Sequence, residues 1–385
     1  MKNIYYWSPC LANVGTVKST INSAIALSKY NNKNYKVFLI NSCGEWDNYR
    51  NLCEENNITL VDLKFKYFKY LPKNGFIQSR FSYVILFLLS YFPLLKMLKK
   101  VQPHFLILHL VTSLPLFLMM TNKFKTQFIL RISGYPKLNF LRKFFWKICS
   151  DRLYCITSPT KDLIKQIKNS GIFNNDKIEY LPDAILNIKN INLEKKDHIK
   201  SEILSKNFFI AAGRLTKQKN FIYLINEFNE FLKVEKKYDL LIFGEGEEKQ
   251  KLKKIIKQYN IEDKVFLMGH TKSLNFAMTK AKAFILSSLW EEPGFVLIEA
   301  ASNNLFIISS DCKNGPKEIL LNGKGGILFK INDHEALASK IRYAIKNKRL
   351  MKKKINLCYK NLYRYNYKKN LDKYFKLIND FNISH

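Results

Sequence analysis

Two spacings of apolar residues alternate along the first part of the chain. Short, nearly continuous apolar runs predict buried strands at residues 3–8, 36–41, 104–110, 127–133 and 152–157. Apolar residues that recur every three or four positions predict helices at residues 17–30, 113–120, 138–149 and 160–168. Strands and helices alternating in this way are typical of βαβ units on a parallel sheet. We therefore expect a Rossmann-like domain over residues 1–185.

A second alternating series follows a polar, lysine-rich connection. It predicts strands at residues 208–213, 239–244, 264–269, 283–288, 306–310 and 326–329. The helices predicted between them lie at residues 220–233, 247–259, 273–281, 295–302, 316–321 and 334–346. With 385 residues, the chain exceeds the size that one core normally reaches. The prediction is an α/β chain with a linker at 186–205, a second Rossmann-like domain at 206–365 and a basic helical segment at 366–385.

The charge of the chain favours a polyanionic partner. Lys and Arg number 64 against 31 Asp and Glu, a formal net charge of +33, which suggests a membrane surface or nucleic acid. The alternative is compositional drift, because Lys, Asn, Ile and Tyr are abundant throughout, as in AT-rich coding sequences. The seven cysteines are scattered without metal-ligand spacing, which fits a reducing cytosol. The first residues lack the features of a signal peptide.

Two segments bear on a membrane. Residues 81–95 are uncharged, but 15 residues are fewer than the roughly 20 that span a bilayer. Pro93 is also expected to interrupt the helix. A buried or interfacial helix is therefore favoured over a transmembrane one. Residues 138–149 predict a basic amphipathic helix that fits a membrane surface, with an ordinary core helix as the alternative. Its apolar residues Leu141, Phe144, Phe145 and Ile148 share one face, and its cations are Arg142, Lys143 and Lys147.

Candidate ligand-binding residues follow the predicted strands of the second series. In parallel sheets, ligands bind beyond the carboxyl ends of the strands. Arg214 and Lys219 follow Gly213 there, and such a pair of cations suits a diphosphate, with a solvated loop as the alternative. Gly244 allows a close backbone approach or a tight turn. Gly269 is placed to border a nucleobase; the histidine after it fits an ordinary surface position.

Two acidic residues flank a predicted helix start. Glu291 precedes a Pro-Gly break, a helix is expected to begin near Phe295, and Glu299 lies about one turn inside it. The first amides of a helix favour an anion. A carboxylate beside an anion site is repelled unless it accepts hydrogen bonds from hydroxyl groups. This pattern therefore predicts that the two carboxylates serve sugar and ribose hydroxyls.

The order and spacing of these residues resemble the donor-site signature of the retaining glycosyltransferases of family 4, which have the GT-B fold. That fold has two Rossmann-like domains facing each other across a cleft, and the resemblance implies that residues 366–385 pack back toward the first domain. It also implies that Arg214 and Lys219 hold the nucleotide diphosphate. Glu291 would then approach donor sugar hydroxyls and Glu299 the ribose. The residues whose backbone would border the donor are Gly213, Gly244, Gly269, Gly294, Phe295 and Val296.

The resemblance extends to the first domain. Gly15 falls in the loop that approaches the donor phosphate, where many members have two adjacent glycines. His109 is nominated to lie near the donor sugar, with an ordinary core histidine as the alternative. Arg131, at another strand end, is nominated to meet an acceptor phosphate.

The implied activity is that of a retaining hexosyltransferase that uses a nucleotide-sugar, with a UDP-type donor favoured, and needs neither metal nor a separate cofactor. Glu291, His109, Arg214 and Lys219 would act in catalysis. The acceptor would be a glycan or lipid-linked glycan in surface polysaccharide or glycoconjugate synthesis. We expect a cytoplasmic enzyme, peripheral on the inner membrane face, without a specific nucleic-acid partner. The alternatives are another GT-B enzyme, such as a nucleotide-sugar epimerase, and a basic nucleic-acid-binding protein.

Overall fold

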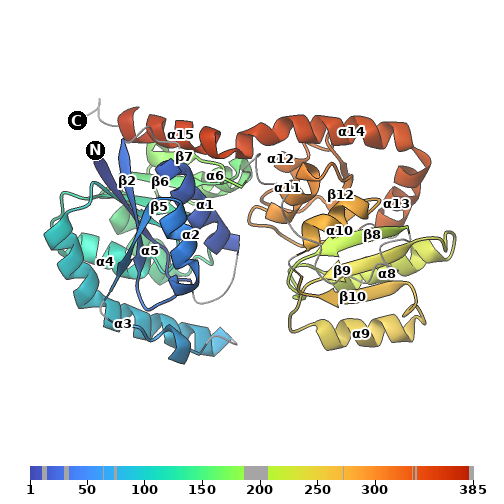
Figure 1. Cartoon of the computed structure of the whole chain (residues 1–385), viewed down its shortest axis with the longest axis horizontal. Coiled ribbons are helices and arrows are strands. Elements are labelled where there is room, and N and C mark those ends of the chain that lie inside the picture. Colours follow the sequence, from blue (N-terminus) through green and yellow to red (C-terminus); the bar gives the residue numbers. More distant parts are fainter. Residues whose placement is uncertain are drawn as a thin grey trace. The chain divides into compact units, whose positions relative to one another are not determined.

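The computed structural model of the chain divides into two compact units. Unit 1 comprises Met1–Leu186 together with Arg364–His385, and unit 2 comprises Asn187–Tyr363 (Figure 1). The linker expected at residues 186–205 lies outside the described residues. The structure describes residues 1–10, 15–29, 34–63, 65–72, 76–185, 207–271, 273–331, 333 and 336–380.

Unit 1 contains a seven-stranded parallel sheet in the order β3-β2-β1-β4-β5-β6-β7. Neighbouring strands pair in parallel throughout, for example Ile4 of β1 with Val37 of β2 and Phe105 of β4. The strands are β1 (Lys2–Trp7), β2 (Tyr35–Asn41), β3 (Ile58–Asp62), β4 (Phe105–Leu108), β5 (Gln127–Arg131), β6 (Cys155–Ser158) and β7 (Ile178–Tyr180).

Helices cover both faces of this sheet. One core cluster joins α3, α4, α5 and α6 to the sheet, and a second joins α1 and α15 to the opposite face. The helices are α1 (Gly15–Lys29), α2 (Arg50–Glu55), α3 (Phe76–Val101), α4 (Ser113–Thr121), α5 (Phe140–Ser150), α6 (Lys161–Asn169) and α15 (Tyr367–Asp380). Short 3-10 helices lie at Asp47–Tyr49, Phe68–Tyr70 and Asn175–Lys177.

Unit 2 repeats this architecture with a six-stranded parallel sheet in the order β10-β9-β8-β11-β12-β13. Its strands are β8 (Phe208–Ala212), β9 (Asp239–Phe243), β10 (Val265–Gly269), β11 (Phe284–Leu286), β12 (Ile307–Ser310) and β13 (Ile327–Phe329). Its helices are α8 (Phe221–Leu232), α9 (Lys249–Gln258), α10 (Leu274–Lys280), α11 (Phe295–Ser302), α12 (Pro316–Ile319), α13 (Ala336–Lys346) and α14 (Lys348–Lys360). A 3-10 helix at Asn361–Tyr365 follows α14.

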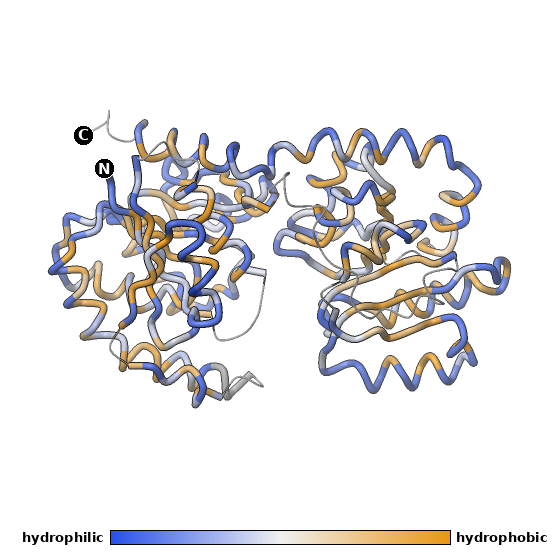
Figure 2. Tube along the Cα trace, viewed as in Figure 1, coloured by the Kyte–Doolittle hydropathy of each residue, from blue (hydrophilic) through white to orange (hydrophobic). Residues whose placement is uncertain are grey.

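The sequence pattern explains these elements. Strands β4 and β8 are apolar on both sides, β9 is apolar after Asp239, and all three are fully buried, as expected when helices cover both faces of a parallel sheet. Helix α9 alternates apolar and polar residues because only one side of it faces the core (Figure 2). The fold class predicted from the sequence, α/β with two Rossmann-like parts, is confirmed.

The expectation that Pro93 interrupts the apolar helix is wrong. Helix α3 runs through Pro93 without a break. By length and composition alone, its segment Arg80–Val101 is also the one helix among the described residues that meets the requirements for crossing a membrane. Part of α3, however, is core: Leu86, Leu94 and Leu98 are fully buried in unit 1.

Each sheet has one point at which the order of its strands reverses direction. In unit 1 it lies between β1 and β4, and in unit 2 between β8 and β11. Connections from two such strands leave toward opposite faces of the sheet, which opens a crevice beyond their carboxyl ends. The loops after β8 and β11 therefore define the candidate site of unit 2, and the loops after β1 and β4 that of unit 1.

Candidate functional site

The loops after β8, β9 and β10 are joined by backbone hydrogen bonds. The amide of Gly213 donates to Phe243 O at 2.9 Å, and the amide of Gly244 donates to Gly269 O at 2.8 Å. A Cβ on Gly244 would lie 1.9 Å from Gly213 O, so no larger residue fits at that position without a backbone shift. The three glycines predicted to border the donor thus form one connected backbone edge.

A buried ion pair lies at the point where the strand order of unit 2 reverses. Lys219, in the loop after β8, places its Nζ 2.6 Å from Glu291 Oε1, in the loop after β11. The Glu291 side chain is 4% exposed and that of Lys219 is 14% exposed. Ser288 Oγ donates to the same carboxylate oxygen at 2.5 Å. The cation and carboxylate that the sequence assigned to one donor site are therefore in direct contact.

The backbone around Glu291 is fixed from several directions. Ser287 Oγ donates to Lys219 O at 2.8 Å, and Ser310 Oγ donates to Ser288 O at 2.7 Å. The amide of Glu291 donates to Lys313 O at 3.1 Å. These contacts hold the loop to its neighbours on both sides. Sequence reasoning did not nominate Ser288; its only signal is a pair of serines directly after a buried strand.

Arg214 and Glu292 extend the charged cluster toward the solvent. Both are exposed, and the Arg214 guanidinium acts on the Glu292 carboxyl. The pKa of Glu292 is raised, first because neighbouring protein atoms displace water from it and second because the Glu291 carboxylate is near. Arg214 and Lys219 act on that pKa in the opposite direction. The charges of Arg214, Lys219 and Glu291 thus all act on the Glu292 carboxyl.

Helix α11 begins at the position predicted from the sequence. Gly294 precedes it with φ 90° and ψ 55°, a left-handed conformation that glycine adopts without strain. Phe295 and Val296 form the start of its first turn, where helix amides and the macrodipole favour an anion. Glu299 is half-buried and lies four residues into the helix. Its predicted contact with a ribose stays a prediction.

In unit 1, His109 directly follows β4, where the strand order reverses. Its amide donates to Trp7 O at 2.9 Å, and its side chain is buried. Neither ring nitrogen has a hydrogen-bond partner among the described residues. Burial, followed by the nearby Arg131 charge, lowers the pKa of His109 well below its usual value. A neutral, unpartnered imidazole fits a hydrogen bond with a bound hydroxyl, but its predicted contact with the donor sugar stays a prediction.

The remaining expectations for unit 1 have different outcomes. Gly15 is exposed and begins α1, but the loop before it at residues 11–14 lies outside the described residues. The assignment of Arg131 to an acceptor phosphate is wrong. Its guanidinium is buried and donates to Leu181 O at 2.6 Å and to Asp183 Oδ1 at 2.8 Å. This internal ion pair satisfies the cation that the sequence assigned to a ligand.

The part of the chain that the structure describes contains no candidate metal-binding site. No group of three His, Cys, Asp or Glu side chains lies close enough there to hold an ion. The chemistry that the unit 2 cluster offers is instead that of hydroxyl and phosphate recognition. Carboxylates accept from hydroxyl groups, and Arg and Lys donate to phosphate oxygens.

Comparison with known proteins gives matches over most of the chain. Residues 194–361 match the family model described as "Glycosyl transferases group 1". An uncharacterised glycosyltransferase of Methanocaldococcus jannaschii is 32% identical over 258 residues, which cover 60% of this chain and 61% of that protein.

A second relative comes from Campylobacter jejuni. It is the N-acetylgalactosamine-N,N'-diacetylbacillosaminyl-diphospho-undecaprenol 4-alpha-N-acetylgalactosaminyltransferase, 26% identical over 236 residues, which cover 59% of this chain and 63% of the relative. The chain thus spans about three fifths of the length of these two relatives.

Solved structures share the fold. A Staphylococcus aureus TarM variant, in complex with fondaparinux, alpha-GlcNAc-glycerol and UDP, superposes with a TM-score of 0.73 at 16% identity, covering 98% of this chain and 100% of that one. At this identity the likeness shows the fold alone. The chain has the GT-B fold, as the sequence implied.

Proposed function

We propose that this chain, whose residues 194–361 match the family model of the group 1 glycosyltransferases, transfers a sugar from a nucleotide-sugar to a glycan or lipid-linked glycan in polysaccharide or glycoconjugate synthesis. The observation that carries the proposal is the buried pair of Lys219 and Glu291, placed where the strand order reverses and beside the start of α11. A carboxylate and a cation in contact at such a crevice suit a ligand with both hydroxyl and phosphate groups.

The proposed donor is a nucleoside diphosphate sugar, with a UDP-type donor favoured. Lys219 and Arg214 would bind the diphosphate, and Glu291 would accept from sugar hydroxyls while Ser288 fixes its orientation. Glu299 would accept from the ribose. Two features support this: the cluster of cations and carboxylates beside a helix N-terminus, and the Staphylococcus aureus TarM variant of the same fold, which was solved in complex with UDP.

The proposed reaction is retaining and needs no metal. The bond between the anomeric carbon and the leaving phosphate oxygen breaks, and its electron pair goes to that oxygen. The acceptor oxygen forms the new bond on the same face, and its proton passes to the leaving phosphate. Lys219 and Arg214 would lower the barrier by neutralising charge that develops on the diphosphate. The gain is larger at Lys219, which is only 14% exposed beside the buried Glu291, than at a fully solvated cation.

The proposed location is the cytoplasmic face of a membrane, with peripheral attachment. The Campylobacter jejuni relative supports this, because its name describes an acceptor linked to diphospho-undecaprenol. An enzyme that extends a lipid-linked acceptor gains from staying at the surface that holds it.

Thermal-shift measurements with UDP test the donor site. UDP at about 100 times its Kd should stabilise the protein by roughly 2.7 kcal/mol. Lys219→Ala and Glu299→Ala should each abolish the shift, measured against the unliganded melting temperature of the same variant. Lys217→Ala, an exposed cation of the same loop, is the matched control and should keep the shift. Unchanged shifts in the Lys219 and Glu299 variants would remove the assignment.

Glu291→Gln separates binding from turnover. It keeps the size of the side chain and should retain most of the UDP shift, whereas sugar transfer should fall by roughly 10²-fold or more, as expected when a group that supports the transition state is lost. Turnover equal to that of the wild type would contradict the role of Glu291. An epimerase would instead convert the nucleotide-sugar to its epimer without any acceptor. Detection of that product would contradict sugar transfer as the reaction of this chain.

A further inference from the structure

One long segment of unit 1 contains no acidic residue. Between Asp62 and Asp151 the sequence contains 15 Lys and Arg and no Asp or Glu. The frequency of acidic residues in the whole chain, 31 in 385, would place about seven in those 88 positions. The segment's share of Lys and Arg is about that of the whole chain, so its net positive charge comes from the missing acidic residues. This segment includes helices α3, α4 and α5.

Helix α3 presents large apolar side chains to the solvent. Its buried side carries Leu86, Leu94 and Leu98, which are fully enclosed in the core. On the other side, apolar residues spaced three or four positions apart form a continuous stripe. These are Phe81 (62% exposed), Val84 (54%), Leu88 (64%) and Phe92 (74%). A soluble surface rarely exposes such a row without a partner.

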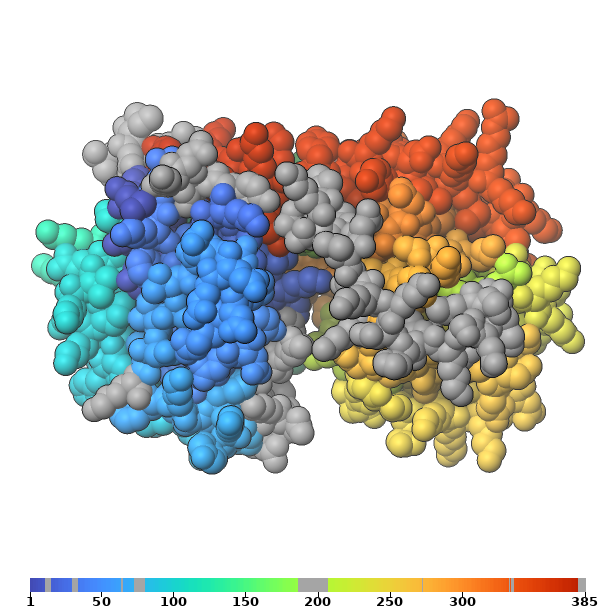
Figure 3. All heavy atoms as spheres, viewed as in Figure 1, coloured from blue at the N-terminus to red at the C-terminus, as the bar shows by residue number. Residues whose placement is uncertain are grey.

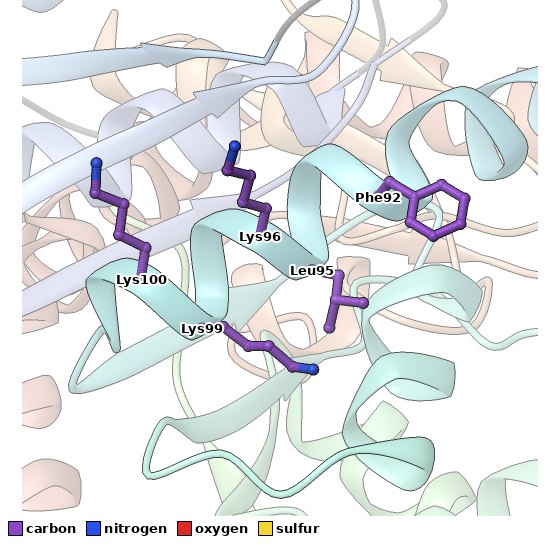
Figure 4. A pocket seen from close by; sticks show the side chains of 5 residues that line it. All are labelled: Phe92, Leu95, Lys96, Lys99 and Lys100. Atoms are coloured by element: carbon purple, nitrogen blue, oxygen red, sulfur yellow. The ribbon is translucent and has the colours of Figure 1, made fainter.

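Three lysines continue this stripe toward the end of α3. Lys96, Lys99 and Lys100 are exposed, and together with Phe92 and Leu95 they line a shallow open pocket of about 520 Å³. Lys96 and Lys100 extend on one side of the helix, while Lys99 extends on the side of Leu95 (Figure 4). Apolar side chains and ammonium groups thus occupy successive turns of one helix.

Helix α5 repeats the combination on the same layer of unit 1. Phe140 and Phe144 are 80% and 60% exposed, their rings stack 6.4 Å apart, and the exposed cations include Lys143 and Lys147. Helix α4 lies between α3 and α5 in the contacts of this layer. All three helices pack on the same face of the sheet.

We propose that this layer is a docking face for an anionic phospholipid bilayer. The docking face consists of Phe81, Leu88, Phe92, Lys96, Lys99 and Lys100, extended by the outward side of α5. The aromatic and aliphatic side chains enter the boundary between headgroups and acyl chains, and the lysines lie at the lipid phosphates. This inference deepens the proposed function by naming the surface that holds unit 1 beside a lipid-linked acceptor.

Other partners fit these observations less well. A second copy of the chain, packed through the same face, would oppose one set of lysines to another without acidic residues between them. Nucleic acid would satisfy the lysines but would leave the apolar stripe in water. A helix that crosses the bilayer would have to withdraw Leu86, Leu94 and Leu98 from the core, at a cost typical of opening a packed interior. A bilayer surface satisfies the cations and the apolar stripe together.

Vesicle co-sedimentation of the full chain tests the docking face. The protein should sediment with vesicles that contain about 30% phosphatidylglycerol and bind vesicles of phosphatidylcholine alone at least tenfold more weakly. Lys96→Gln/Lys99→Gln/Lys100→Gln should weaken binding to anionic vesicles about 100-fold, because each lysine near such a surface contributes roughly fivefold. Leu88→Glu/Phe92→Glu should weaken it by at least tenfold, since two apolar side chains that enter the bilayer would be replaced by charges.

Matched controls lie on unit 2. Lys251→Gln/Lys253→Gln/Lys254→Gln removes three exposed charges from α9, which forms part of the outer surface of its unit (Figure 3). Val234→Glu introduces a charge at a residue that is 72% exposed, close to the 74% of Phe92. Both controls should keep wild-type binding. Equal losses in the α3 and control variants would mean a general charge effect and would overturn the docking face.

Two further outcomes would also overturn it. One is a wild-type chain that does not sediment with anionic vesicles. The other is a dimer, or a complex with DNA, that the α3 variants abolish while vesicle binding is unchanged. The UDP thermal shift of the same variants should stay at the wild-type value, which also shows that they are folded. Vesicle binding without any UDP shift would support the docking face and contradict the proposed function.

Discussion

The buried side chain of His109 makes the unfolding free energy of unit 1 depend on pH. Its imidazole is buried in unit 1, and neither ring nitrogen has a partner among the described residues. Its pKa is well below the usual 6.5 because burial penalises the charged form and the Arg131 charge adds to that penalty. The unfolded chain therefore takes up a proton near pH 6.5 that the folded chain does not. Stability is unaffected above that pH and is lost as the pH falls below it.

We expect His109→Gln to reduce this pH dependence. Between pH 7.5 and 5.5, the unfolding free energy of unit 1 should fall by about 1 kcal/mol more in the wild type than in the variant. Urea unfolding followed by tryptophan fluorescence measures it, in a Trp290→Phe background where the remaining tryptophans, Trp7, Trp46 and Trp146, all lie in unit 1. The exposed His270→Gln in unit 2 is the control and should keep the wild-type slope. Parallel curves for His109→Gln and the wild type would contradict the assignment.

At the residue scale, the sequence predicted that residues far apart in the chain serve one site. Lys219 and Glu291 lie 72 positions apart; the rule that ligands bind beyond strand ends marked both loops, and the resemblance to family 4 glycosyltransferases assigned both residues to one site. The same rule failed for Arg131, which also follows a strand. Its partner Asp183 lies 52 positions away in an irregular segment. Propensity and spacing carry no information about such a segment, so an internal ion pair there could not be predicted.

The start of α13 depends on a carboxylate from another helix. Glu227 of α8 is buried, and its Oε2 accepts from the amides of Leu337 at 3.0 Å and Ala338 at 3.1 Å. The first amides of a helix have no partner within the helix, and a negative charge there is also favoured by the macrodipole. A single side chain on α8 thus satisfies two donors of a helix more than 100 residues further along the chain.

Glu227→Ala should lower the unfolding free energy of unit 2 by about 2–3 kcal/mol, because two buried amides lose their acceptor. Glu227→Gln keeps an acceptor oxygen without the charge and should cost about 1 kcal/mol. Hydrogen exchange of peptides from α8 and α13 reports the change. Glu230→Ala on the same helix breaks a surface pair with Lys233 and should cost less than about 0.5 kcal/mol. Equal costs at positions 227 and 230 would show that the cap contributes nothing.

At the element scale, periodicity located the helices but did not show which side of each would face the core. For α5, the apolar face predicted from Leu141, Phe144 and Ile148 is mostly exposed. Trp146 and Cys149 on another side face the core instead. Both sides carry apolar residues, so the pattern was compatible with either orientation. Contacts with the sheet decide between them, and these depend on elements far away in the sequence.

At the scale of the whole molecule, unit 1 contains both an early and a late part of the chain. Helix α15 packs on α1, and its Leu371, Tyr374 and Ile378 are enclosed in the core on that face of the sheet. The Asn370 side-chain amide also donates to Pro182 O at 2.7 Å. Residues 364–380 therefore add to the stability of unit 1, although residues 207–363 between them and the first part of the chain belong to unit 2.

Tyr374 tests how strongly unit 1 depends on this late helix. Its side chain is 1% exposed, and its hydroxyl accepts from Ser23 Oγ at 3.2 Å. Tyr374→Ala should lower the unfolding free energy of unit 1 by about 3–5 kcal/mol, as for other large aromatic side chains removed from a core. Tyr374→Phe keeps the ring and should cost only about 1 kcal/mol. Tryptophan fluorescence in the Trp290→Phe background follows unit 1, while the UDP thermal shift follows unit 2 and should not change. A loss of the UDP shift in Tyr374→Ala would mean that the two units do not unfold independently, and the stability of unit 1 would then have to be treated together with the donor site.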